Sequence, residues 1–160
     1  MAPLAKILFV ASILAAGCDL AGETIGPRGG VVVSEDGRFS VEIAAGALDR
    51  DVDITIEAVS CGETDGLALG PCYEVGPRGT AFLFPAKVTM ELDAGEFDAV
   101  SADRLALSSR REQHWDLLAD RKVDLDDGTV SASASYLSSF AVVSMADEPH
   151  GSATRNHDDQ

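Results

Sequence analysis

The chain has 160 residues, which is enough for one domain with a single hydrophobic core. Its formal net charge is −15, with 27 acidic against 12 basic side chains. Because such a chain repels phosphate backbones and anionic lipid headgroups, neither nucleic acid nor a charge-attracted membrane surface is expected as a partner.

The first 17 residues have the pattern of a secretory signal peptide. Lys6 is their only charge, and an apolar run at residues 7–16 ends in small side chains. Ten apolar residues are too few to cross a bilayer as a helix. Residues 1–17 are therefore predicted to direct export and then to be removed.

A cysteine closes this run, in the segment LAAGC at residues 14–18. The segment resembles the cleavage site of bacterial lipoprotein signals, except that Ala15 stands where Leu is most frequent. The resemblance implies that Cys18 becomes the lipidated first residue of the mature protein. Several acyl chains on one residue hold a protein stably on a membrane. We expect a lipoprotein of the bacterial cell envelope that faces the periplasm or the cell surface. The sequence does not decide between anchoring in the inner membrane and anchoring in the outer membrane. Residues 18–24 would be its tether.

Strand patterns follow the tether. Apolar side chains alternate with polar ones in residues 39–43 and 52–58, which is the period of a strand with one buried face. Asp36-Gly37 precedes the first of these strands and predicts a tight hairpin turn, because both residues tolerate a positive φ. The start of the domain is therefore predicted to be a meander of short antiparallel strands.

Short strands are also predicted further along the chain, at residues 72–75, 80–84, 88–92, 105–107, 115–117, 129–134 and 140–143. Loops are expected at residues 60–71 and 93–103, and no helical period extends over a useful length. About eight or nine short strands separated by turns predict an all-β fold, an antiparallel β-sandwich over residues 25–145. Residues 146–160 are polar without an apolar period and are predicted to be a disordered tail.

The three cysteines are an odd number for an exported chain. If Cys18 carries lipid, Cys61 and Cys72 remain as a pair that encloses ten residues. An oxidising compartment favours a disulfide between them, with two buried free thiols as the alternative. By the chain-entropy estimate this disulfide would stabilise the fold by about 2 to 3 kcal/mol.

The order of these motifs resembles the ZU5 domain, which occurs in ankyrins, netrin receptors and many bacterial surface proteins. The resemblance spans roughly residues 25–144 and is carried by Gly29-Gly30, Asp36-Gly37, residues 43–48 (IAAGAL), 76–82 (GPRGTAF) and 85–88 (PAKV), Trp115 and residues 138–142 (SSFAV). It implies a β-sandwich and, by analogy with ankyrins, a role in binding another protein. None of these motifs is catalytic, so the resemblance bears on fold more than on function.

Some ZU5 domains cleave themselves at a His-Phe-Ser sequence just before the last strand. The corresponding positions here hold Tyr136, Leu137 and Ser138. The nucleophile is therefore present and its base is not, because a phenol with a pKa of about 10 is a poor base at neutral pH. Autoprocessing at Ser138 is the least favoured interpretation.

Two acidic clusters could bind a cation. Asp124, Asp126 and Asp127 form one, and Asp49, Asp51 and Asp53 form the other. Closely spaced carboxylates can gather oxygen ligands around Ca²⁺, but neither cluster has the spaced Gly and Glu of an EF-hand. A solvated acidic face is the preferred interpretation, and no resident metal is predicted.

Histidine and tryptophan offer little more. His150 and His157 lie in the predicted tail, and His114 is predicted to be an isolated loop residue. Trp115 is expected to anchor the core between the sheets rather than to stack on a sugar ring.

These patterns predict a non-enzymatic, lipid-anchored envelope domain without a cofactor, which mediates protein–protein interaction or scaffolding. Its partner would be another envelope protein, and its membrane contact would be the lipid on Cys18. A ligand-binding envelope domain for Ca²⁺ or a glycan is the alternative.

Overall fold

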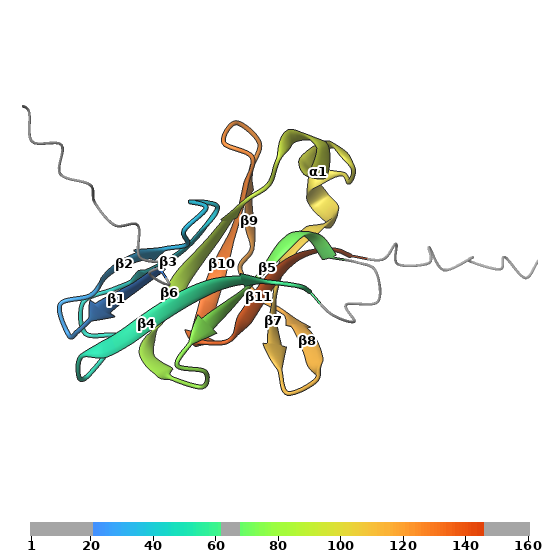
Figure 1. The fold of residues 1–160 in the computed structure, drawn as a ribbon. Coiled ribbons are helices and arrows are strands. Elements are labelled where there is room, and N and C mark those ends of the chain that lie inside the picture. Colours follow the sequence, from blue (N-terminus) through green and yellow to red (C-terminus); the bar gives the residue numbers. More distant parts are fainter. Residues whose placement is uncertain (1–20, 62–67, 146–160) are drawn as a thin grey trace, which may run out of the picture.

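The computed structural model describes residues 21–61 and 68–145. Within these ranges eleven strands form two antiparallel sheets that pack face to face (Figure 1). The predicted all-β sandwich is confirmed, with more strands than the eight or nine expected. Among the described residues, no helix has the length and apolar character that crossing a membrane requires.

One sheet has six strands, in the spatial order β1 (Ala21–Ile25), β4 (Val52–Val59), β5 (Ala68–Gly76), β11 (Ser139–Ser144), β7 (Leu105–Arg111) and β8 (His114–Leu117). The other has five, in the order β2 (Gly30–Val33), β3 (Phe39–Ile43), β6 (Ala81–Glu91), β10 (Thr129–Tyr136) and β9 (Lys122–Asp124). The connection from β6 to β7 contains the short helix α1 (Ala94–Asp98) and a 3₁₀ turn (Ala102–Arg104).

The alternation in the sequence sets the register of the five-stranded sheet. Val41 of β3 pairs with Val32 of β2 on one side and with Val88 of β6 on the other. All three valines are buried, and they lie in the core between the sheets. A shift by one residue would turn them to solvent, so burial fixes this register strongly.

Aromatic rings fill the centre of the core. Phe39 of β3 stacks on both Tyr73 of β5 and Phe140 of β11, with ring centroids 4.9 and 5.6 Å from its own. All three side chains are fully buried. Because Phe39 belongs to one sheet and the other two rings to the opposite sheet, this stack joins the two layers.

A polar network joins the sheets beside this stack. The hydroxyl of Tyr73 donates to Asp36 Oδ2 at 2.6 Å, and the hydroxyl of Ser34 donates to Asp36 Oδ1 at 2.6 Å. The backbone N–H of Arg38 donates to the same carboxylate at 3.1 Å. Partial burial opposes ionisation of Asp36, but the hydrogen bonds outweigh it and hold its pKa below the usual value. Burial, together with the bond to Asp36, raises the pKa of Tyr73.

The side chain of Arg38 extends this network to the helical connection. Its guanidinium group hydrogen-bonds Glu96 and lies 3.3 Å from Asp93 Oδ2. Glu96 also accepts the backbone N–H of Asp93 at 2.9 Å, which caps α1. The hairpin between β2 and β3 is therefore tied both to the opposite sheet and to α1.

The predicted tether is wrong for residues 21–24. They belong to β1, which pairs with β4 from Ala21 opposite Ile56 to Ile25 opposite Val52. The strand lies at a sheet edge, and Gly22, Glu23 and Thr24 are exposed there. No apolar alternation marks a strand of this kind in the sequence.

Three other boundaries differ from the prediction. β5 begins at Ala68, inside the loop expected at residues 60–71, and α1 lies inside the loop expected at residues 93–103. β6 continues through Pro85 rather than ending there. Proline cannot donate to a sheet, but Pro85 lies outside the residues of β6 that pair with β3 and beside a register shift in β10.

Candidate binding site

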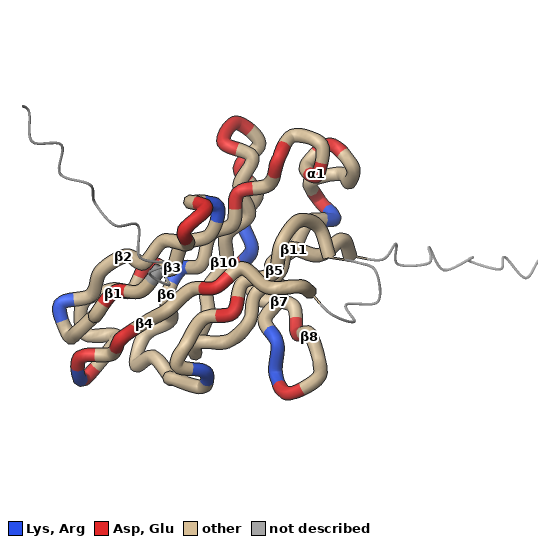
Figure 2. The backbone as a smooth tube through the Cα atoms, in the orientation of Figure 1, with Lys and Arg blue, Asp and Glu red and all other residues tan. Residues whose placement is uncertain are grey.

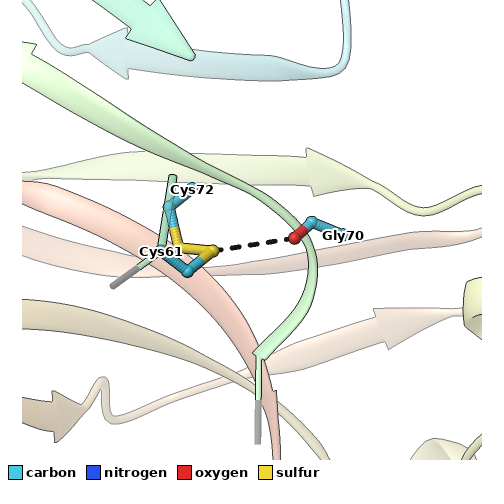
Figure 3. Close-up of a disulfide and its surroundings, with 3 residues drawn as sticks. All are labelled: Cys61, Gly70 and Cys72. Carbon is cyan, nitrogen blue, oxygen red and sulfur yellow. Dashed lines mark hydrogen bonds between the residues drawn. A yellow bond between two sulfur atoms is a disulfide. The ribbon is translucent and has the colours of Figure 1, made fainter. Parts of the chain in front are cut away.

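The predicted disulfide between Cys61 and Cys72 is present (Figure 3). The bond links Cys61, which lies just after β4, to Cys72 in β5, and the two Cα atoms are 5.0 Å apart. Cys61 Sγ lies 3.7 Å from the carbonyl oxygen of Gly70. Cys18, the predicted lipidation site, lies outside the described residues.

Trp115 is not in the core between the sheets, contrary to the prediction. It is half-buried and packs against a second apolar cluster that contains Cys72, Ala106 and Ala141. In β7, Leu105 on one side of Ala106 belongs to the main core, so the second cluster occupies the outer face of the six-stranded sheet. A tryptophan on a strand can cover either the inner or the outer face of a sheet. The sequence does not tell which face Trp115 covers.

The histidine next to Trp115 also differs from its prediction. His114 begins β8, opposite Arg111 of β7, rather than lying in a loop. Its side chain is exposed. The hairpin itself, with strands at residues 105–107 and 115–117, is confirmed.

The acidic turn after β9 is held by hydrogen bonds within the turn. Asp124 Oδ1 accepts the backbone N–H groups of Asp126 at 3.1 Å and Asp127 at 3.3 Å. In the second cluster Asp53 accepts the hydroxyl of Thr24 at 2.5 Å. Within residues 21–61 and 68–145 no group of three or more His, Cys, Asp or Glu side chains is placed to hold a metal ion.

Ser138 lies in the connection between β10 and β11. It is 4% exposed, and its hydroxyl donates to the backbone carbonyl of Arg110. The carbonyl of Leu137, which a self-cleaving serine at position 138 would attack, accepts the N–H of Gly79 at 2.8 Å. Both groups therefore take part in hydrogen bonds that join neighbouring segments of the sandwich.

A cavity of about 210 Å³ opens beside Ser138. We call it the arginine pocket, since three guanidinium side chains line it. Its lining consists of Arg78, Gly79, Arg110, Arg111, Glu112, Tyr136, Leu137 and Ser138. In Figure 2 basic segments mark both the end of β7 and the loop between β5 and β6, at the lower end of the view.

Each arginine of the pocket has a different environment. Arg78 donates to Glu74 Oε2 at 2.6 Å and to the hydroxyl of Ser139 at 3.0 Å. The guanidinium carbon of Arg111 lies 5.5 Å from the ring centroid of Tyr136. Arg110 is half-buried, and within the described part of the chain its Nε is buried without a hydrogen-bond acceptor.

Two large apolar side chains are exposed next to this pocket. Leu83 is 69% and Phe84 is 59% exposed, and we call this pair the Leu83–Phe84 surface. Leu83 also lines a cavity of about 260 Å³ between the β3–β4 and β5–β6 connections. The sequence contained one sign of this surface. Residues 82–85 (FLFP) are apolar without interruption, whereas a strand with one wet face alternates.

The arginine pocket and the Leu83–Phe84 surface are neighbours. Gly79 lines both cavities, and Tyr136 of the pocket pairs with Ala81 of β6. Leu83 is two residues further along the same strand, a distance of about 7 Å. An arginine-lined cavity and an exposed apolar pair thus lie together at one end of the sandwich.

Comparison of the sequence with protein-family models and with curated proteins finds no match.

Proposed function

We propose that this chain is a non-enzymatic, lipid-anchored domain of the bacterial cell envelope that binds another protein through the Leu83–Phe84 surface. The observation that carries the proposal is the exposure of two consecutive large apolar residues on a strand. Exposed apolar patches mark interaction sites, and aromatic residues such as phenylalanine are enriched at the centres of protein interfaces.

A structural role does not account for this exposure. Phe82, one residue earlier in β6, packs partly against the main core, and Ala86 is buried in it. Leu83 and Phe84 contribute little to that core, although the same strand could have carried polar side chains at their positions. Both residues are therefore better explained by a contact outside this chain.

The proposed anchor suits such a contact. Cys18 precedes the first residue of β1 by three positions, so an extended chain would hold lipid and strand within about 10 Å. β1 is one edge of the six-stranded sheet, and β7 and β8 are at the other edge. With four strand spacings between β1 and β7, the arginine pocket would lie about 19 Å from the anchored edge.

The involvement of Ser138 in main-chain bonding supports a non-enzymatic role. Its buried hydroxyl already donates to the carbonyl of Arg110. Tyr136, which stands where self-cleaving relatives of the ZU5 type have their base, lies under the guanidinium group of Arg111. Neither arrangement prepares the hydroxyl for nucleophilic attack.

Site-specific photo-crosslinking in the native bacterium tests this proposal. A photoreactive phenylalanine analogue in place of Phe84 should give a discrete product of higher mass on irradiation. Leu125 provides the matched control, because it is 67% exposed but lies in the turn after β9, at the opposite end of the sandwich. The same analogue at position 125 should not give that product.

A second substitution measures the contribution of the surface. Leu83→Ser in the crosslinking chain should lower the product yield about tenfold, the effect expected when an apolar anchor worth roughly 1.4 kcal/mol is removed. Its thermal stability should be unchanged because Leu83 is exposed. Equal products from positions 84 and 125, or none from position 84, would contradict the proposed interface.

A further inference from the structure

The arginine pocket has no assigned role, and we propose that it binds a carboxylate of the protein that contacts the Leu83–Phe84 surface. This inference rests on the proposed function, because the ligand belongs to the partner proposed there. The partner segment would carry an acidic side chain close to an apolar one.

The pocket lining carries three cationic side chains, and among the described residues only one of them forms an ion pair. Of its three arginines, Arg78 is paired with Glu74, whereas in the described part of the chain Arg110 and Arg111 form no ion pair. Glu112 is the one carboxylate in the lining, so positive charge exceeds negative charge among the lining residues. In a chain of net charge −15 such a local excess is unusual.

The guanidinium groups of the pocket, Arg110 among them, favour a carboxylate as the ligand. Nε of Arg110 is a buried donor without an acceptor, and a donor left in that state costs free energy. Guanidinium groups bind carboxylates through two parallel hydrogen bonds when the carboxylate approaches in their plane. An entering carboxylate would therefore supply a counter-charge for these guanidinium groups, although Nε of Arg110, which is closed to solvent, lies outside its reach.

The size and the surroundings of the pocket favour a single carboxylate over a polyanion. A volume of about 210 Å³ admits a small group but not a chain of phosphates. The net charge of −15 repels an extended polyanion over its whole length. One carboxylate feels mainly the charges within a Debye length of about 8 Å at physiological salt, and these include the three arginines of the lining.

The neighbouring apolar surface indicates what accompanies the carboxylate. Leu83 lies about 7 Å along β6 from the Ala81–Tyr136 pair, and Tyr136 lines the pocket. An extended peptide covers this distance in about two residues. A partner segment with an apolar residue two or three positions from an acidic one would reach both features.

A titration of the free protein tests the pocket without the partner. The probe is N-acetyl-glutamate amide, and N-acetyl-glutamine amide is the uncharged match, both added at constant ionic strength while backbone amide resonances are recorded. The glutamate compound should shift the resonances of Gly79, Glu112 and Ser138 in a saturable manner. The glutamine compound should not shift them.

Two variants change the charge of the pocket in opposite directions. Arg111→Gln should weaken binding of the glutamate probe about tenfold, the loss of one charge-assisted hydrogen bond. Glu112→Gln should tighten binding, because it removes the opposing charge. Both side chains are exposed, so neither change should unfold the protein. Arg28→Gln, in the loop after β1, should leave the affinity unchanged.

Other results would overturn the inference. Saturable shifts with inorganic phosphate but not with the glutamate probe would assign the pocket to phosphate groups. No shift with either probe, or equal shifts in wild type and Arg111→Gln, would show that the arginines do not bind a carboxylate.

The crosslinking experiment separates this inference from the proposed function. If Arg111→Gln leaves the product from position 84 at its full yield, the partner binds without the pocket and only the carboxylate inference fails. If position 84 gives no product while the glutamate probe binds, the interface fails and the pocket remains an anion site.

Discussion

Replacing Cys61 and Cys72 together with alanine should lower the free energy of unfolding by about 2 to 3 kcal/mol. The bond restricts a short loop, so its removal mainly increases the entropy of the unfolded chain. Alanine suits position 72 because this side chain is 1% exposed and faces apolar neighbours, where a serine hydroxyl would need a partner. Chemical denaturation at pH 7 measures the difference.

Reduction supplies the control for this prediction. A reductant should destabilise the wild-type protein by a similar amount and leave the double alanine variant unchanged. If reduction lowers the stability of the variant as much as that of the wild type, the effect does not arise from this disulfide. Equal unfolding midpoints of variant and wild type without a reductant would show that the bond contributes nothing.

Tyr73→Phe should lower the free energy of unfolding by about 1 to 2 kcal/mol at pH 7. The change keeps the ring that stacks on Phe39 and removes the hydroxyl that donates to Asp36 Oδ2. A hydrogen bond to a charged acceptor is worth more than this when fully buried, but Asp36 is exposed enough for water to replace part of it. The loss is therefore moderate.

The effect of Tyr73→Phe should depend on pH. The pKa of Asp36 is lowered in the folded protein, so its carboxylate stabilises the fold above the unfolded-state pKa of about 3.9. This contribution disappears as the pH falls through the lower folded-state value. The difference between wild type and Tyr73→Phe should then be smaller at pH 2 to 3 than at pH 7.

Tyr136→Phe is the matched control, because Tyr136 is the only other tyrosine of the chain and Asp36 is not bonded to it. Its effect on stability should not follow the titration of Asp36. A difference for Tyr73→Phe that is the same at pH 3 and pH 7 would contradict the role assigned to the bond between Tyr73 and Asp36.

The strands that alternation of apolar and polar residues predicted are those with one buried face. In β3 the apolar period of two appears directly, as Phe39, Val41 and Ile43, and all three residues are buried. β1 could not be found in the same way, since its exposed edge position allows polar residues such as Glu23 and Thr24. Local periodicity identifies a strand only where a single face meets the core.

The disulfide and the arginine pocket show which sites the local sequence can predict and which it cannot. Cys61 and Cys72 could be paired because the count of cysteines left few choices. Arg78 and Arg110 are far apart in the sequence, and they come together because β11 lies between β5 and β7. No local motif encodes that neighbourhood. Trp115 shows a related failure, because strand periodicity does not tell which face of a sheet is the inner one.

The intact mass of the protein extracted from its native membrane tests the proposed lipid anchor together with the disulfide. The mass should equal that of residues 18–160 plus acyl chains, and two alkylatable thiols should appear only after reduction. A chain that keeps residues 1–17, or that starts beyond Cys18 without lipid, would contradict the anchor. A product ending at Leu137 would contradict the non-enzymatic proposal, since it would show that the chain is cleaved before Ser138.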